Sequence, residues 1–128
     1  AVWGLSFKPK TDDVREAPAI DIIRSLLHAR AKVRVYDPVA MPNTQKIFGS
    51  RLQYARKPLD AARGAHALLI LTEWQEFRSP DFAQLRETMK SWVIFDGRNL
   101  FDPAAIRNEK FSYYAFGRPP VIAARTSN

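Results

Sequence analysis

The 128-residue sequence contains no cysteine. Disulfide bonds, thiolate metal sites and a cysteine nucleophile are therefore excluded within this chain. The sequence also has no run of 18 apolar residues, and it does not open with a basic leader, an apolar core and a cleavage site. It therefore shows neither a transmembrane helix nor an export signal. We expect a cytoplasmic protein that makes no membrane contact.

What the sequence does contain is typical of an ordinary globular domain. Hydrophobic residues make up 46%, charged residues 26% and aromatic residues 12%, which excludes a disordered, collagen-like or coiled-coil chain. The length predicts one domain that buries about two thirds of its unfolded surface. Residues 1–5 already have strand character and Ala1 is not an initiator methionine, so we expect a piece of a longer protein.

Positive charge is in excess, and it is unevenly distributed. The formal net charge is +7; residues 1–64 hold 12 basic and 6 acidic side chains, whereas residues 65–128 hold 8 and 7. A basic excess predicts an anionic partner. Nucleic acid, an anionic membrane surface and a phosphorylated small molecule would each satisfy the charge alone.

Short apolar runs alternate with segments of helical periodicity, which predicts parallel strands joined by crossover helices. In residues 18–31, Ile20, Ile23 and Leu27 recur at helical spacing after Pro18, a residue suited to a first helical turn. We therefore expect an α/β fold of three layers, with a Rossmann-like, doubly wound and mostly parallel sheet of five or six strands. The expected strands are residues 1–5, 32–36, 52–54, 67–71, 92–95 and 111–115, and the expected helices are residues 18–31, 42–48, 58–63, 80–89 and 103–108.

The dinucleotide-binding turn of such folds, G-x-G-x-x-G after the first strand, is absent. Gly4 is the only glycine near the first strand, and the next is Gly49, so no glycine-rich loop brings backbone amides against a pyrophosphate. Asp37 follows the second strand, where a ribose-binding carboxylate would lie. Without the glycine turn, we expect Asp37 to form a turn with the proline that follows it.

Cationic residues follow two of the expected strands. Residues 7–18 form a charge-dense loop that contains Lys8 and Arg15, and Arg98 follows the fifth strand. Because the carboxyl ends of parallel strands share one edge of the sheet, we expect Lys8 and Arg98 to converge on one crevice. Ammonium and guanidinium groups bind diphosphates and nucleotides, although charges at strand ends are also commonly just solvated.

Four motifs occur in order along residues 1–118: Gly4-Leu-Ser-Phe-Lys8 with Thr11-Asp-Asp-Val-Arg15-Glu16 and Pro18, then Val35-Tyr-Asp-Pro38, then Thr72-Glu-Trp74 with Phe77, and finally Asp96-Gly-Arg-Asn99. Together they resemble the C-terminal domain of the UDP-glucose 6-dehydrogenase family. The resemblance implies a degenerate Rossmann fold that binds the nucleotide part of a nucleotide sugar, whose alcohol the enzyme oxidises to a carboxylate with two NAD molecules. We expect residues 1–118 to form this domain and residues 119–128 to form a flexible tail.

The resemblance also implies roles for individual residues. Phe7 and Lys8 would contact the substrate, Arg98 would hold its UDP moiety, and Arg15 would reach the NAD held by an N-terminal domain. The family's catalytic cysteine and the residues around it lie outside this chain, so we expect no catalytic residue, no metal ligand and no activity of the chain alone. The implied partners are UDP-glucose or UDP-glucuronate and the N-terminal and central parts of the same enzyme, which we expect to be a homo-oligomer.

Other conspicuous residues have structural interpretations. Asp12 and Asp13 precede a predicted helix, and we expect them to bond its free amides or to favour its positive end, and so to compensate for Ala17, where many members of the family have serine. Aromatic residues near the strand ends are expected to pack rather than to stack on a base.

Two functions from other classes stay open. One is a stand-alone nucleotide-sugar-binding module, and the other is a nucleic-acid-binding domain. We do not expect nucleic acid as the partner, because the cations form no aromatic-interleaved stripe. Within the family, the Thr72-Glu-Trp74 motif with Phe77 favours the UDP-glucose branch over the UDP-N-acetylmannosamine and GDP-mannose branches.

Overall fold

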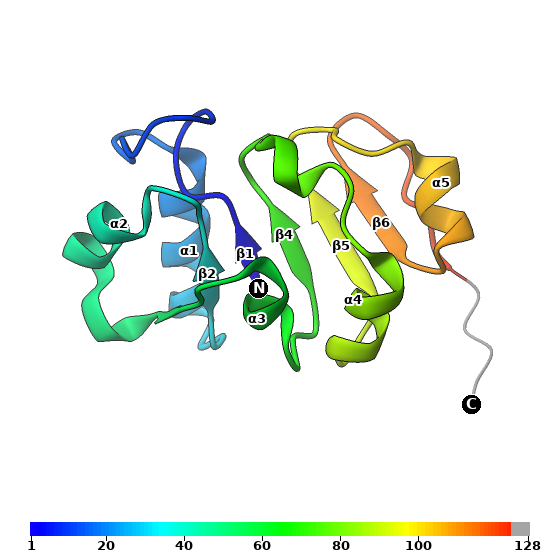
Figure 1. Ribbon diagram of the computed structural model, residues 1–128, viewed down its shortest axis with the longest axis horizontal. Coiled ribbons are helices and arrows are strands. Elements are labelled where there is room, and N and C mark those ends of the chain that lie inside the picture. Colours follow the sequence, from blue (N-terminus) through cyan, green and yellow to red (C-terminus); the bar gives the residue numbers. More distant parts are fainter. Residues whose placement is uncertain (124–128) are drawn as a thin grey trace.

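A parallel sheet of six strands forms the centre of the computed structural model, which describes residues 1–123. The strand order is β3-β2-β1-β4-β5-β6, and each neighbouring pair is parallel (Figure 1). This confirms the predicted doubly wound α/β fold. The strands are β1 (Val2–Trp3), β2 (Arg34–Tyr36), β3 (Gln53–Tyr54), β4 (Leu68–Ile70), β5 (Val93–Asp96) and β6 (Ser112–Ala115).

Five α-helices lie between the strands of the described part, as expected. They are α1 (Pro18–His28), α2 (Met41–Phe48), α3 (Pro58–Ala62), α4 (Phe82–Thr88) and α5 (Pro103–Asn108), with two short 3-10 helices, η1 (Gly49–Arg51) and η2 (Gln75–Phe77). All but α4 carry a proline at their first or second position, where its missing N–H costs nothing. Within residues 1–123, no helix has the length and apolar character needed to cross a bilayer.

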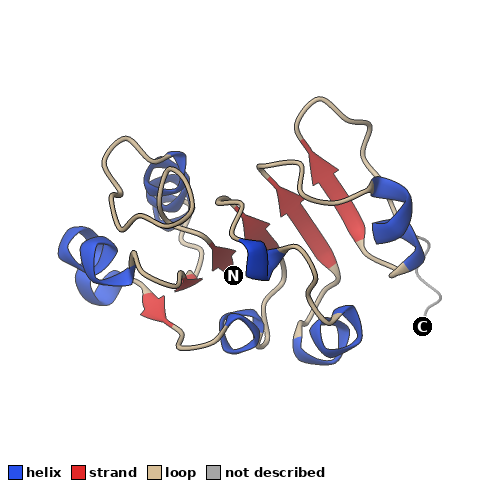
Figure 2. Cartoon of the chain, turned by 45° about the horizontal axis from the view of Figure 1, so that its top comes forward, coloured by secondary structure: helices blue, strands red, loops and turns tan. Residues whose placement is uncertain are grey.

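The sheet carries a separate apolar core on each face. Val2 and Trp3 are consecutive in β1 and almost fully buried, yet they belong to different clusters, because successive side chains of a strand point to opposite faces. Val2 belongs to the cluster of Ile23 in α1, and Trp3 belongs to that of Leu85 in α4. Figure 2 shows helices on both sides of the strands, so the fold has three layers.

Most elements are one to three residues shorter than predicted, and for two of them the structure shows a local cause. Strand β1 ends at Trp3 because Gly4 has a φ of 95° and turns the chain away from the ladder. Helix α1 ends at His28 rather than at residue 31. There Arg30 adopts a positive φ of 67°, and its N–H folds back onto the Leu27 carbonyl, which closes the helix end.

The chain remains paired with the sheet beyond residue 118. Val121 and Tyr113 form an antiparallel bridge in which each backbone N–H donates to the other's carbonyl, at 2.9 Å and 2.8 Å. The expected flexible tail covered residues 119–128, of which residues 124–128 lie outside the described residues. The domain boundary at residue 118 stays a prediction.

Candidate functional site

The carboxyl ends of parallel strands lie together at one edge of a sheet, which is where doubly wound folds bind ligands. Two segments of this chain meet that edge (Figure 1). We call residues 5–17, after β1, the β1 loop, and residues 97–101, after β5, the β5 turn. The predicted cations Lys8, Arg15 and Arg98 belong to these segments, so the β1 loop and the β5 turn form the candidate site.

Gly4 allows the chain to leave β1 and enter the β1 loop. Its φ of 95° lies in the left-handed region, and a Cβ atom there would lie 2.6 Å from Thr72. Only glycine fits this combination of backbone conformation and close approach. Thr72 in turn donates its hydroxyl to the carbonyl of Ser6 at 2.7 Å. The start of the β1 loop is therefore fixed to the end of β4.

Asp37 fixes the same point from the end of β2. Its buried carboxylate accepts the backbone N–H of Leu5 at 2.9 Å on Oδ2 and those of Val39 and Ala40 at 2.8 Å on Oδ1. This confirms the expected turn-forming role of Asp37. Because both oxygens are already engaged by backbone donors, Asp37 holds the edge together.

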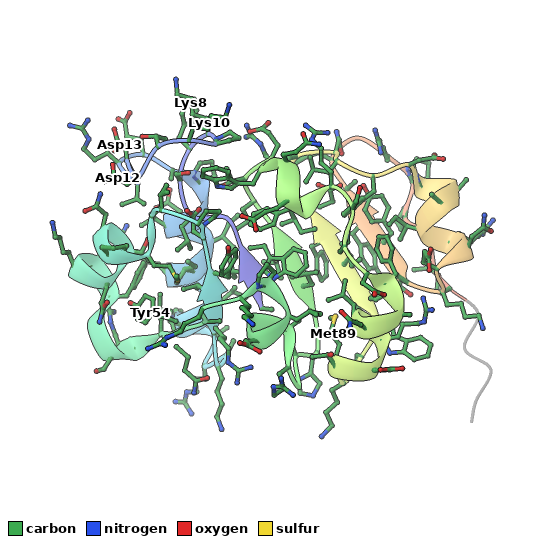
Figure 3. All side chains as sticks on the ribbon, in the orientation of Figure 1. Lys8, Lys10, Asp12, Asp13, Tyr54 and Met89 are labelled. Carbon is green, nitrogen blue, oxygen red and sulfur yellow. The ribbon has the colours of Figure 1, made fainter. Side chains whose placement is uncertain are left out.

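The outer part of the β1 loop surrounds a hollow of about 630 Å³. Figure 3 shows Lys8 and Lys10 at the outer rim of the molecule. Phe7 is 55% exposed, although it is a large apolar side chain. The hollow is lined by Phe7, Lys8, Thr11, Asp13, Arg15 and Glu16. Three of the four predicted site residues therefore share one hollow, and their roles toward a ligand stay predictions.

Arg15 is held by a carboxylate of its own loop. Its Nε and Nη2 atoms donate to Asp13 at 3.0 Å and 2.8 Å, and its backbone N–H donates to the same carboxylate at 2.9 Å. These hydrogen bonds lower the pKa of Asp13 to about 2. The Arg15 side chain is nevertheless 88% exposed, so a ligand can reach it.

The expectation that Asp12 and Asp13 bond the free amides of α1 is wrong. The residue before α1 is Ala17, and no side chain caps the helix there. Asp13 lies four residues before Ala17 and uses its carboxylate on Arg15 instead. The local turn at Asp13 outcompetes the helix end because its partner is only two residues away.

The β5 turn is built around a buried carboxylate, Asp96, which is 2% exposed. Its Oδ1 accepts the backbone N–H of Arg98 at 3.0 Å, and its Oδ2 accepts the N–H of Leu100 at 2.7 Å and the phenol of Tyr113 at 2.6 Å. Burial, and then the hydrogen bond to Asp96, raise the pKa of Tyr113 well above its ordinary value. The backbone that carries Arg98 is thus fixed from inside the protein.

The side chain of Arg98 is fixed as well, by Glu73. Nη2 of Arg98 lies 2.8 Å and 3.0 Å from the two carboxylate oxygens of Glu73, and Nε lies 3.2 Å from one of them. These hydrogen bonds lower the pKa of Glu73. About 30% of each side chain is exposed, so the pair is half-buried yet open to a ligand.

Sequence reasoning placed Lys8 and Arg98 in one crevice. The structure places them at the same edge, but Arg98 does not line the hollow of Lys8. Sequence reasoning also missed Glu73 as the partner of Arg98. Part of a signal was present, since Glu73 follows β4 as Arg98 follows β5, but that β4 and β5 are neighbours is known only from the structure.

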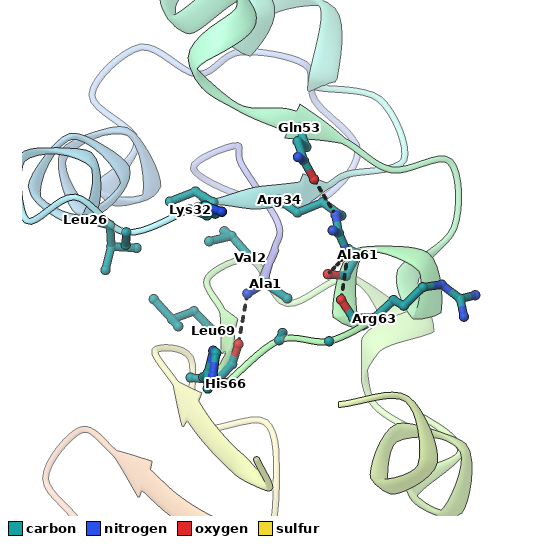
Figure 4. Close-up of a pocket in the computed structure, with 15 residues that line it drawn as sticks. Ala1, Val2, Leu26, Lys32, Arg34, Gln53, Ala61, Arg63, His66 and Leu69 are labelled. Carbon is teal, nitrogen blue, oxygen red and sulfur yellow. Dashed lines mark hydrogen bonds between the residues drawn. The ribbon is translucent and has the colours of Figure 1, made fainter. Parts of the chain in front are cut away.

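A second hollow, of about 450 Å³, lies at the opposite edge of the sheet (Figure 4). Arg34 dominates it, but the Nη1 of this side chain donates to the carbonyls of Asp60 and Arg63 at 3.1 Å and 2.8 Å, and its Nε donates to Gln53 at 2.9 Å. Arg34 therefore closes the end of α3 and ties it to β3. We assign this hollow a structural role.

The residues present do not form a cradle for a dinucleotide. The space beside Gly4, where the glycine turn of a classical site would face a pyrophosphate, is filled by Thr72 of the same chain. Within residues 1–123, no three His, Asp or Glu side chains are grouped to hold a metal ion. What the carboxyl edge offers is cationic side chains, which suit an anionic organic ligand.

A doubly wound sheet with cations at its carboxyl edge and no glycine-rich loop defines a Rossmann-like binding domain. Residues 1–103 match the family described as "UDP-glucose/GDP-mannose dehydrogenase family, UDP binding domain". The chain therefore belongs to this family, as its motifs predicted.

Several curated bacterial relatives are named UDP-glucose 6-dehydrogenase. The chain is 42% identical over 124 residues to a UDP-glucose 6-dehydrogenase of Pseudomonas aeruginosa, and 45% identical over 119 residues to one of Rhizobium meliloti. Each match covers 93% of this chain but only 27% of the relative. The chain thus spans about a quarter of the length of these relatives.

Solved structures of dehydrogenases also match most of this chain and about a quarter of their own length. A UDP-glucose dehydrogenase from Pyrobaculum islandicum matches with a TM-score of 0.72 and 32% identity, over 88% of this chain and 24% of that chain. An NDP-N-acetyl-D-galactosaminuronic acid dehydrogenase from Methanosarcina mazei matches with a TM-score of 0.76 and 26% identity, over 92% and 24%. The fold is therefore common to dehydrogenases named for different nucleotide sugars.

Proposed function

We propose that this chain is the UDP-sugar-binding domain of an NAD-dependent UDP-glucose 6-dehydrogenase, which converts UDP-glucose and two NAD into UDP-glucuronate. The family match of residues 1–103, together with the cationic carboxyl edge, is the observation that carries this proposal. Oxidation of a primary alcohol to a carboxylate removes four electrons, so two hydride acceptors are needed. The chain contributes substrate recognition to that reaction.

UDP-glucose is favoured over other nucleotide sugars by sequence rather than by fold. Curated relatives named UDP-glucose 6-dehydrogenase match at 36–45% identity. Solved dehydrogenases named for N-acetylated sugars match at 26–28%, although they share the fold with TM-scores of 0.64–0.76. The substrate class is therefore a UDP-sugar, and UDP-glucose is the member we propose.

Within the site, Phe7 and Lys8 contact the substrate and Arg98 holds its UDP moiety. Lys8 is exposed at the rim of the β1 loop, where its ammonium group can bind an anionic or polar part of the nucleotide sugar. Phe7 beside it offers an apolar surface, because it is 55% exposed. These side chains approach the ligand from the carboxyl edge, as in other doubly wound folds.

NAD supplies the hydride acceptor of this reaction when it is bound to the enzyme. This chain does not hold it alone, because the space beside Gly4 is filled by Thr72. Arg15 is the one residue of the chain that we assign to NAD, since its guanidinium is 88% exposed and can pair with phosphate oxygens. The chain also contains no cysteine, so we propose that it is inactive by itself.

The remaining partners follow from the length of the relatives. Since the chain spans about 27% of their sequences, its partners are the NAD-binding and central parts of the same enzyme. We propose a cytoplasmic homo-oligomer that binds neither nucleic acid nor a membrane. A water-excluding site would then form only when this domain closes on the others.

An amide NMR titration of the chain with UDP-glucose, and with GDP-mannose for comparison, tests the proposal. We expect shifts in the β1 loop and the β5 turn that are larger for the uridine ligand and weaker in Lys8→Ala. Lys10→Ala is the matched control, because Lys10 belongs to the same loop but does not line its hollow. No shift with either ligand at millimolar concentration would contradict the proposal that this chain holds the uridine nucleotide.

A further inference from the structure

Arg98 is positioned twice, once through its backbone and once through its side chain. Asp96 accepts its backbone N–H at 3.0 Å, and Glu73 accepts from Nε and Nη2 at 2.8–3.2 Å. A guanidinium has five N–H donors, two of them on Nη1. Within residues 1–123, no protein acceptor engages Nη1 of Arg98. The fold therefore holds one side of the guanidinium and leaves its far edge to a ligand.

We propose that Glu73 is the positioning residue of Arg98, and that the pair selects an uncharged oxygen of the nucleotide, a base carbonyl or a hydroxyl, rather than its phosphates. The inference rests on the proposed function, because the ligand is taken to be the UDP-sugar. It adds Glu73 to the site and assigns Arg98 a chemical preference. No contact of Glu73 with the ligand is required.

The first reason is orientation. An unpaired arginine samples many rotamers, and a ligand must then freeze them on binding. Glu73 binds the guanidinium side-on through Nε and Nη2, which fixes the plane of the group before the ligand arrives. Because each partner is only about 30% exposed, the pair keeps its geometry better than a fully exposed one.

The second reason is charge. The carboxylate of Glu73 lies 2.8 Å from Nη2, so the pair is close to neutral as seen from the ligand. A neutral pair attracts a diphosphate weakly, whereas its Nη1 protons still bind a carbonyl or hydroxyl oxygen. Lys8 has no ion-pair partner among the described residues. At this edge Lys8 therefore offers an ammonium group that no carboxylate of residues 1–123 engages, and the phosphates are expected beside it.

A competing role for Glu73 predicts the opposite sign. If Glu73 only occupied Arg98 until a ligand displaced it, removal of the carboxylate would tighten nucleotide binding. If Glu73 positions Arg98, its removal weakens binding, and the effect disappears once Arg98 is gone. The two roles are thus separated by the direction of one measured change and by its dependence on Arg98.

The test is calorimetric titration of the chain with UDP and, separately, with inorganic pyrophosphate. The variants are Glu73→Ala, Arg98→Ala and the double variant, with Glu76→Ala as the control, because Glu76 is a nearby carboxylate that does not contact Arg98. Thermal unfolding of each variant shows whether it is folded. We expect Glu73→Ala and Arg98→Ala each to raise the Kd of UDP about tenfold, the size of one hydrogen bond to a charged group.

Three further results are expected. The double variant binds UDP no more weakly than Arg98→Ala alone, Glu76→Ala leaves the Kd of UDP unchanged, and Glu73→Ala binds pyrophosphate more tightly than the wild type. Tighter or unchanged UDP binding in Glu73→Ala, additive effects in the double variant, or unchanged pyrophosphate binding would each overturn the inference while the proposed function stands. A wild-type chain that binds no UDP would overturn the proposed function, and this inference with it.

Discussion

The two segments of the candidate site each hold an arginine, but they do so by different means. In the β1 loop, Arg15 pairs with Asp13, two residues earlier, and its side chain is 88% exposed. In the β5 turn, Arg98 pairs with Glu73, 25 residues away at the end of β4, and its side chain is 30% exposed. The first pair needs only its own loop, whereas the second exists only when β4 and β5 have paired. Arg15 can therefore exchange its carboxylate for a ligand, while Arg98 is held by the fold.

The backbones of the two segments differ in the same sense. The β5 turn is fixed by Asp96, which is buried and accepts hydrogen bonds from inside the turn and from β6. The β1 loop is fixed at its start, where Gly4 meets Thr72, and by one hydrogen bond of 2.8 Å from Asn43 of α2 to the carbonyl of Asp12. The other side-chain hydrogen bonds of its outer part come from within the loop. We infer that the β5 turn is a preformed part of the site and that the β1 loop adapts to the ligand.

Removal of the Asp96 carboxylate should have the largest effect, because it would take away the group that fixes the β5 turn. Asp96→Ala leaves the N–H of Leu100 and the phenol of Tyr113 without their acceptor in the interior. An unpaired buried donor costs about 1–3 kcal/mol, so we expect the free energy of unfolding to fall by about 3–5 kcal/mol, measured by urea denaturation.

Asp102→Ala is the control for this experiment. Asp102 lies just beyond the β5 turn, is exposed, and accepts one long hydrogen bond of 3.4 Å at the start of α5. Its removal should cost less than about 1 kcal/mol. Equal losses in the two variants would mean that the β5 turn does not depend on its buried carboxylate.

The second largest effect is expected at the start of the β1 loop. In Gly4→Ala, the new Cβ would lie 2.6 Å from Thr72 at a φ of 95°, so we expect a loss of about 2–4 kcal/mol of unfolding free energy. Gly64→Ala is the matched control, since Gly64 also has a positive φ, of 70°, but nothing lies within 4 Å of its Cβ position. Gly64→Ala should lower the free energy of unfolding by about 1 kcal/mol. An equally small loss in Gly4→Ala would contradict the close approach of residue 4 to Thr72.

The fold was predictable because its signals are local. Pro18 and the apolar spacing after it predict α1 without any knowledge of the rest of the chain, and the prolines of the other segments do the same. The cations of the site were also predictable, because the β1 loop and the β5 turn that carry them each follow a strand. The early end of β1 was not predictable in this way, since Gly4 lies in an apolar run that predicts a strand, and its contact with Thr72 is formed only in the fold.

The ion pairs within the site were harder to predict than the positions of their cations. Asp13 was assigned to a helix end, but it binds Arg15 because the local turn brings its carboxylate to that side chain first. The pair of Glu73 and Arg98 depends on the register of β4 and β5, in which Ile70 lies opposite Asp96. Sequence spacing alone does not give this register, and so the partner of Arg98 emerged only from the structure.

The pH dependence of the unfolding free energy tests the ion pair of Glu73 and Arg98 at the β5 turn. Hydrogen bonds from Arg98 lower the pKa of Glu73 below its ordinary value of 4.5, so the pair stabilises the fold above about pH 4.5 and loses this contribution as the pH falls through the lowered pKa. Near neutral pH, we expect the free energy of unfolding of the wild type to be higher than that of Glu73→Gln by less than about 1 kcal/mol. This difference in unfolding free energy should become smaller as the pH is lowered. A difference that became larger would contradict the ion pair of Glu73 and Arg98.

The smallest effect on stability is expected at the exposed pair of the β1 loop. Hydrogen bonds from Arg15 lower the pKa of Asp13 from 3.8 to about 2, so any contribution of the pair is complete above about pH 4 and is lost between about pH 4 and pH 2. Because solvent and salt screen both side chains, we expect no measurable change in the unfolding of Arg15→Ala near neutral pH.

The Asp13 carboxyl itself is the better probe of this pair. An NMR titration of its side-chain carbon should give a midpoint of about 2 in the wild type. The midpoint should move toward 3.8 in Arg15→Ala and stay unchanged in Arg98→Ala, since Arg98 belongs to the other pair. A wild-type midpoint near 3.8 would show that Arg15 is not held in solution. In that case the β1 loop would offer its arginine to a ligand without first breaking an ion pair, and the contrast with Arg98 would be greater still.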